Sequence, residues 1–230
     1  QVIEYSLERS HAGTTDHEVK IRLSDTEITG ILSYKRYKTE DPWTEVQMSR
    51  DGENLTANLP NQPRAGKLMY RVALTKGLNI IDLPEDQPVI IRFRGDVPAL
   101  IMIPHIFMMF LSMLISTRAG FEAFLNRENI IKLAYWSAGT LFVGGLILGP
   151  IMQEYAFGDL WTGFPFGYDL TDNKTLIAMI GWIAALIAVK RGKNPRYWIL
   201  GAAILEFIIF IIPHSVLGSE LDYSKMDNVR

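Results

Sequence analysis

Residues 98–117 read PALIMIPHIFMMFLSMLIST, and this stretch decides the fold class of the chain. Apart from one histidine it contains no ionisable side chain, and a helix needs about 20 such residues to cross the hydrocarbon core of a bilayer. Further apolar stretches follow at about 130–152, 173–190 and 197–217. The sequence therefore predicts a membrane protein whose helices form a four-helix transmembrane bundle over 98–230.

The residues before this stretch differ in composition. Residues 1–97 carry most of the charge, although hydrophobic residues make up 48% of the whole chain. Segments such as 19–23 and 89–93 alternate apolar and polar residues, and turn signals such as Asp51–Gly52 separate them. About six or seven strands at this spacing predict an all-β sandwich of two packed sheets over 1–97.

One part of the N-terminal half carries a resemblance. Leu59–Pro60 is followed by Tyr70–Arg71–Val72. This arrangement resembles the tyrosine corner of fibronectin type III and immunoglobulin-like domains. The resemblance implies a spacing or docking domain without chemistry of its own, to which an extracytoplasmic protein or partner subunits would bind.

Basic residues are unevenly distributed among the loops. Arg118, Arg127 and Lys132 lie around the first loop, and 190–196 holds four further basic residues, whereas 153–174 holds one Lys and four acidic residues. Cytoplasmic loops are enriched in Lys and Arg, so both basic loops are expected inside. The sequence predicts a multi-pass protein of the plasma (inner) membrane, with the sandwich, the loop 153–174 and the C-terminus on the periplasmic side.

Several function classes receive no support from the sequence. The net charge of −2 and the lack of a basic stripe argue against a nucleic-acid partner. The chain has no Cys, which excludes disulfides and covalent heme attachment. No nucleophile constellation or nucleotide-binding fingerprint occurs, so we do not expect an enzyme. Because the chain begins at Gln1 rather than Met, removal of a signal peptide or anchor is one expectation.

Two histidines fall in the outer third of the predicted membrane segments. His105 follows Pro104 in the first segment, and His214 follows Pro213 in the fourth. Polar groups at this depth are costly and usually face the bundle interior. Two imidazoles at one depth can ligate one metal, either a heme iron or copper. Alternatively, they are unrelated histidines, each bonded to backbone or water.

The stretch 157–174 reads FGDLWTGFPFGYDLTDNK. The order of elements along the chain is an outer histidine, two spans, this aromatic loop, two further spans and a second outer histidine. This order resembles the heme-handling module of cytochrome c biogenesis membrane proteins. The family's loop carries several tryptophans, whereas this one has Trp161 alone. The resemblance implies that His105 and His214 ligate heme, with Trp161 and Asp169 at the heme site. The alternative is an amphipathic cap that packs on the sandwich.

Two further features compete with this interpretation. Glu206 lies near the middle of the fourth apolar stretch, where a carboxylate is either a proton or ion site or a hydrogen-bonded packing element. Met102, Met108, Met109 and Met113 lie in the first stretch, and with the histidines they offer a copper site as a minor alternative.

These features lead to three functional hypotheses. The first is a heme-associated membrane protein that delivers heme or passes electrons as a b-type cytochrome. The main rival is a non-catalytic subunit of a larger membrane complex, which docks outer-face partners through its sandwich. The third is an ion- or proton-coupled component centred on Glu206.

Overall fold

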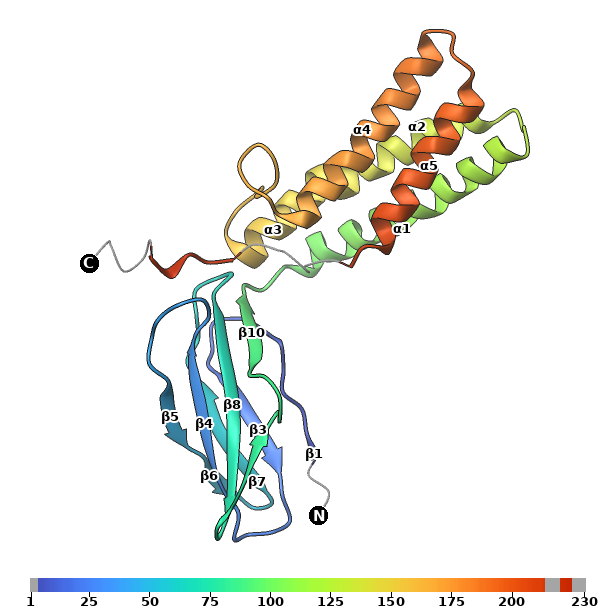
Figure 1. Cartoon of the computed structure of the whole chain (residues 1–230). Coiled ribbons are helices and arrows are strands. Elements are labelled where there is room, and N and C mark those ends of the chain that lie inside the picture. Colours follow the sequence, from blue (N-terminus) through green and yellow to red (C-terminus); the bar gives the residue numbers. More distant parts are fainter. Residues whose placement is uncertain (1–3, 214–219, 225–230) are drawn as a thin grey trace. The chain divides into compact units, whose positions relative to one another are not determined.

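The computed structural model describes residues 4–213 and 220–224, which belong to two compact units. The β unit contains the chain up to Asp96 together with the residues from Glu220 onward. The helical unit comprises Val97–Ser219. A β-rich N-terminal region followed by helices is therefore confirmed (Figure 1).

The β unit contains two sheets whose neighbouring strands are antiparallel, except that β2 and β10 run parallel. The first has the order β1-β3-β7-β6, formed by Glu4–Tyr5, His17–Arg22, Asn54–Leu59 and Ser49–Asp51. The second has the order β2-β10-β8-β4-β5, formed by Ser10–Ala12, Val89–Arg94, Lys67–Lys76, Thr29–Arg36 and Thr44–Gln47, and β9 (Asn79–Leu83) pairs with β8.

Alternating side chains of both sheets form one hydrophobic core. On β3, Val19 and Ile21 are buried, while Glu18, Lys20 and Arg22, which alternate with them, are exposed. On β8, Leu68, Tyr70 and Val72 point into the same core. This alternation is the two-residue period of a sheet with one buried face.

The alternating segments that the sequence singles out are strands, namely β3, β4, β5, β8 and β10. The turn signals are also confirmed: Gly52 and Gly77 have φ angles of 56° and 58°, in the left-handed region that glycine tolerates. Strand β7 was not predicted from the sequence. Its inward-facing residues Leu55 and Leu59 are separated by Thr56, Ala57 and Asn58, and it contains no Val or Ile, so its sequence carries little strand preference.

Tyr70 anchors the N-terminal segment to this core. Its side chain is fully buried, and its hydroxyl donates a hydrogen bond of 2.9 Å to the carbonyl oxygen of Glu8. The hydroxyl of a tyrosine corner instead bonds to backbone a few residues upstream. The resemblance to fibronectin type III and immunoglobulin-like domains stays a prediction.

Within the described residues, the helical unit has four continuous helices. They are α1 (Ala99–Phe124), a helix made of α2 (Ile130–Leu141), the π-helical segment η1 (Phe142–Leu148) and α3 (Gly149–Phe157), then α4 (Leu170–Lys190) and α5 (Pro195–Ile211). Among the described residues, three of these helices are long and apolar enough to cross a membrane: Ala99–Phe124, Ile130–Phe157 and Leu170–Lys190.

The first helix is longer than the apolar stretch 98–117 that predicts a membrane span. It begins at Ala99 and continues to Phe124. Arg118 is compatible with this extension, because its Nε lies 2.9 Å from Oε1 of Glu122, one turn further along the helix. The fourth expected stretch, 197–217, runs beyond the described part of α5.

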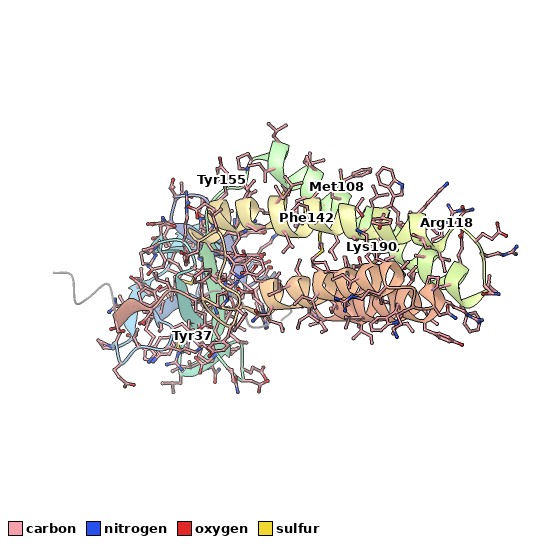
Figure 2. All side chains as sticks on the ribbon, turned by 90° about the horizontal axis from the view of Figure 1, so that it is seen from above. Tyr37, Met108, Arg118, Phe142, Tyr155 and Lys190 are labelled. Atoms are coloured by element: carbon pink, nitrogen blue, oxygen red, sulfur yellow. The ribbon has the colours of Figure 1, made fainter. Side chains whose placement is uncertain are left out.

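The connections of the helical unit divide between its two ends (Figure 1). The connections 125–129 and 191–194 lie at one end, and the loop 158–169 lies at the other. Figure 2 shows Arg118 toward the first end and Tyr155 toward the second. The two basic connections therefore share one end of the unit, opposite the aromatic loop.

Candidate functional site

A buried carboxylate connects three helices of the helical unit. Glu206 of α5 is fully buried. The Oγ of Ser112 on α1 donates to its Oε1 at 2.8 Å, and the indole Nε1 of Trp182 on α4 donates to its Oε2 at 2.5 Å. Both carboxyl oxygens therefore have donors from different helices, an arrangement that crosslinks α1, α4 and α5.

The same network reaches the second helix. The Oγ of Ser112 also lies 3.2 Å from the carbonyl oxygen of Ser137 on α2. Ser116, one turn along α1, is also buried. Buried polar groups gain most when every member has a partner. The geometry is that of a packing element, and a proton or ion role for Glu206 stays a prediction.

His105 is held by the π-helical segment. Its Nδ1 lies 2.9 Å from the carbonyl oxygen of Gly144, and a carbonyl only accepts, so Nδ1 carries the proton. Nε2 of the neutral ring then keeps its lone pair. Gly149 approaches the same imidazole, since a Cβ atom at that position would lie 3.7 Å from Cε1 of His105.

The π-helical segment has a local cause. Pro150 has no amide hydrogen and would clash with the carbonyl four residues earlier in a regular α-helix. The amide of Gly149 bonds instead to the carbonyl of Gly144, five residues back. Gly144 also permits close approach of α1, because a Cβ atom there would lie 2.9 Å from Cβ of Met108. π-Helical segments occur frequently at functional sites.

The aromatic loop is built on the first turn of α4. The amide of Thr162 donates to Oδ2 of Asp172 at 2.7 Å, and the amide of Phe164 donates to Oδ1 of Asn173 at 2.7 Å. Gln153 of α3 donates from Nε2 to Oγ1 of Thr162 at 2.6 Å. These bonds tie the loop to both helices that flank it.

Two glycines allow the loop to fold this tightly. A Cβ atom at Gly167 would lie 2.3 Å from the carbonyl oxygen of Thr162, and one at Gly163 would lie 2.6 Å from Cβ of Asp172. The half-buried Trp161 bonds from Nε1 to the carbonyl of Phe164 at 3.0 Å. The loop is therefore a compact structure with its own hydrogen bonds.

The aromatic rings at the tip of this loop face outward. Phe164, Phe166 and Tyr168 are 68%, 84% and 94% exposed. Large exposed apolar surfaces commonly mark a site for a ligand, a partner or lipid. The loop thus holds a group of uncovered aromatic rings on a hydrogen-bonded base.

The residues expected at the heme site have separate contacts in the structure. His105 contacts Gly144 of the π-helical segment, and Trp161 bonds within the aromatic loop to Phe164. The carboxylate of Asp169 accepts a hydrogen bond of 2.8 Å from the amide of Thr171, which makes it the N-cap of α4.

Other expected ligands do not join these residues. His214 lies outside the described residues, so the structure leaves its pairing with His105 untested. In the part of the chain that is described, no three His, Cys, Asp or Glu side chains are grouped to hold a metal ion. Met109 packs against the helical core, with its sulfur 3.1 Å from where a Cβ atom of Gly144 would lie.

Sequence reasoning missed several buried polar residues. Lys174 is 4% exposed, and its Nζ donates a hydrogen bond of 2.7 Å to the carbonyl of Ile212. Asp172 is also buried. The sequence places Asp172 and Lys174 where the predicted outer loop 153–174 meets the third apolar stretch, 173–190, a position typical of the first turn of a helix, but it does not predict their burial. Ser112 and Trp182 gave no signal, since nothing in the sequence links them to Glu206.

No protein-family model matches the chain, and no curated protein sequence matches it. The function must therefore be argued from these sites.

Proposed function

We propose that the chain is a membrane protein that holds heme near the end of its helical unit that carries the aromatic loop. The observation that carries this proposal is the hydrogen bond between Nδ1 of His105 and the carbonyl of Gly144. A histidine that ligates a metal usually donates its other ring N–H to such an acceptor, which fixes the orientation of the ring. His105 would bind the heme iron through Nε2, and His214 would supply a second ligand.

The remaining residues fit a flat, apolar ligand. Phe164, Phe166 and Tyr168 are exposed on a compact loop and would cover part of the porphyrin. Heme would supply an iron that accepts and gives up one electron. The protein would position the heme, shield it from water and set the donor properties of His105 through the carbonyl of Gly144.

We further propose that α5 is a fourth transmembrane span. Its 17 helical residues are apolar apart from residues near its start and Glu206. The chain leaves the β unit at Val97 and belongs to it again from Glu220. A chain that starts and finishes on one side of a membrane crosses it an even number of times. With three spans, the residues from Glu220 onward would lie on the side of the membrane opposite to the rest of the β unit.

The sidedness follows from the basic residues. Residues 125–129 and 191–194 lie at one end of the helical unit, and 190–196 holds four basic side chains. The positive-inside rule would place this end in the cytoplasm. The β unit, the aromatic loop and the C-terminal residues would then lie outside the inner membrane, in the periplasm.

An absorption spectrum tests the heme proposal. The protein purified from its native membrane should show a Soret band, and His105→Ala and His214→Ala should each abolish it while the protein remains inserted. His11→Ala is the matched control, because His11 lies on β2 of the β unit, and it should leave the band unchanged. A protein without a Soret band, or an unchanged band in His105→Ala, contradicts the proposal.

A second candidate function is docking of partner proteins in a membrane complex. The β8–β9 hairpin favours it, because Leu78 and Ile80 are exposed apolar residues and β9 pairs only with β8 among the described strands. Exposed apolar edge strands are sites of pairing with other chains.

Co-purification with and without a hairpin substitution tests this function. The variant Ile80→Lys should lose a fixed set of partner proteins. Thr44→Lys on β5, at the opposite edge of the same sheet, should retain them. Equal recovery of partners with both variants would rule out the hairpin as the docking surface.

A further inference from the structure

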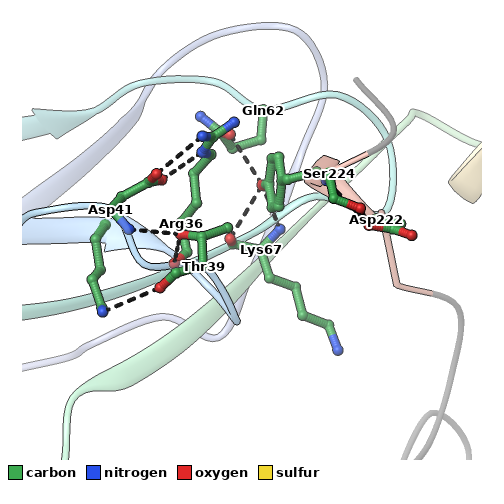
Figure 3. Close-up of polar contacts among 9 residues, drawn as sticks. Arg36, Thr39, Asp41, Gln62, Lys67, Asp222 and Ser224 are labelled. Atoms are coloured by element: carbon green, nitrogen blue, oxygen red, sulfur yellow. Dashed lines mark hydrogen bonds and ion pairs between the residues drawn. The ribbon is translucent and has the colours of Figure 1, made fainter. Parts of the chain in front are cut away.

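Residues 220–224, which we call the tail, pack against the β unit (Figure 3). They lie between the connection after β4 and the residues that precede β8. We call the surface that they occupy the tail cleft, and it is formed by Arg36, Lys38, Gln62, Ala65, Gly66 and Lys67.

Tyr223 is the buried anchor of the tail. It is 6% exposed, its hydroxyl accepts from the amide of Lys67 at 3.0 Å, and it lies 3.1 Å from Oε1 of Gln62. The guanidinium of Arg36 lies 5.0 Å from the centre of its ring, within cation–π range. A Cβ atom at Gly66 would lie 2.9 Å from the hydroxyl, so this glycine makes room for the tyrosine.

Glu220 is the charged anchor. Its carboxylate lies 2.6 Å from Nζ of Lys38 and 2.5 Å from Nζ of Lys67. Burial raises the pKa of Glu220, but the hydrogen bonds from the two lysines outweigh it and hold the pKa below its ordinary value. Between the two anchors, the amide of Leu221 donates to the carbonyl of Ala65 at 3.1 Å.

The cleft is organised by bonds that do not involve the tail. The Nε of Arg36 lies 2.5 Å from Oδ2 of Asp41, which fixes the guanidinium. Thr39 donates from Oγ1 to the carbonyl of Arg36 at 3.0 Å. On the other side, the amide of Gly66 bonds to the carbonyl of Pro63 at 2.8 Å. A basic pair, a slot for an aromatic ring and a backbone acceptor are thus in place for a ligand.

We propose that the tail cleft is a peptide-binding site for an acidic residue followed three positions later by tyrosine, and that the chain's own tail occupies it as a removable plug. Lys38 and Lys67 would bind the carboxylate of the peptide, and Arg36 and Gly66 would accommodate the tyrosine. A partner peptide of the same chemistry binds when the tail leaves. This inference does not depend on heme.

Removal of the plug is physically accessible because part of the binding is weak. The ion pair between Glu220 and Lys38 lies at the surface, and surface ion pairs contribute little. The tail belongs to the same molecule as its cleft, which gives it an effective concentration of about 1 mM. A free peptide with a dissociation constant of about 100 μM would then be weakened about tenfold by the tail.

Fluorescence anisotropy with a labelled peptide of residues 218–230 tests the proposal. The chain truncated after Ser219, in lipid nanodiscs, should bind this peptide saturably, and the whole chain should bind it about tenfold more weakly. The double variant Glu220→Ala/Tyr223→Ala keeps the length of the chain but disables the plug, so it should bind the peptide as the truncated chain does.

Two sets of variants separate recognition from unspecific attraction. Peptides with Glu220→Ala or Tyr223→Ala should lose binding, and Lys67→Ala in the truncated chain should weaken it. Lys20→Ala, an exposed lysine of the other sheet, should not. Absence of binding to both the truncated chain and the double variant overturns the proposal, and so does equal binding of the peptide by the whole and truncated chains.

Discussion

The substitution Glu206→Leu tests how far one carboxylate stabilises the helical unit. Both of its oxygens accept hydrogen bonds, from Ser112 at 2.8 Å and from Trp182 at 2.5 Å. Leucine has no acceptor. Ser112 can then still donate to the carbonyl of Ser137 at 3.2 Å, but the indole N–H of Trp182 stays buried without its acceptor.

The size of the effect follows from the number of bonds affected. Interhelical hydrogen bonds in membrane proteins average about 0.6 kcal/mol and reach about 1.7 kcal/mol. Loss of the bond to Trp182, together with its buried donor left without an acceptor, should lower the free energy of unfolding by about 1–2 kcal/mol. Glu122→Gln is the control, because it removes only the ion pair with Arg118 on one face of α1, which is worth about 0.2–0.5 kcal/mol.

A double-mutant cycle with Trp182→Phe isolates the contact. Unfolding in mixed micelles, followed by circular dichroism, should give a coupling free energy of about 0.6–1.7 kcal/mol between residues 206 and 182. Strictly additive single and double variants would refute the crosslink. So would a Glu206→Leu protein as stable as Glu122→Gln.

Three further predictions concern the β unit and the topology. Tyr70→Phe should lower the free energy of unfolding by about 0.5–1.5 kcal/mol in pulse proteolysis, since it removes only the bond to the exposed Glu8. Burial and a neighbouring histidine lower the pKa of His17 in the folded protein, so at acidic pH the unfolded chain binds more protons at this residue than the folded chain does. The free energy of unfolding should therefore fall as the pH drops below 6.5, and His17→Asn should reduce this pH dependence. Because the chain has no Cys, an impermeant thiol reagent applied to intact cells should label Asp159→Cys but not Lys193→Cys; equal labelling would contradict the proposed sidedness.

Sequence periodicity predicted the elements whose signal is local. The alternation in β3 and β8 and the apolar runs of α1 and α4 each lie within one segment, so a period of two or a long run identifies them. The apolar run 98–117 does not give the end of α1, because a helix continues past a charged residue such as Arg118 that has a partner one turn away.

The polar contacts of the sites were beyond sequence reasoning. Glu206 stood out because a carboxylate is rare in an apolar run, but its donors Ser112 and Trp182 are ordinary residues of other helices. Which helix faces bring them together depends on packing, which one sequence does not reveal. Lys174 illustrates the same limit, since its hydrogen bond to Ile212 turns a residue of an apparently hydrophilic loop into a buried one.

The tail connects the β unit to the question of how often the chain crosses the membrane. The four apolar stretches predict four spans, yet α5 is the shortest of the four helices in the described part of the chain and carries a buried carboxylate. The contacts of Glu220 and Tyr223 with Lys67 give an independent argument, because they return the chain to the unit from which α1 departs. With an odd number of crossings, Glu220 and Tyr223 would lie on the opposite side of the membrane from Lys67, and these contacts could not form. The peptide-binding experiment and the thiol-labelling experiment therefore constrain each other: a tail that plugs its cleft in the same molecule is incompatible with a cytoplasmic C-terminus.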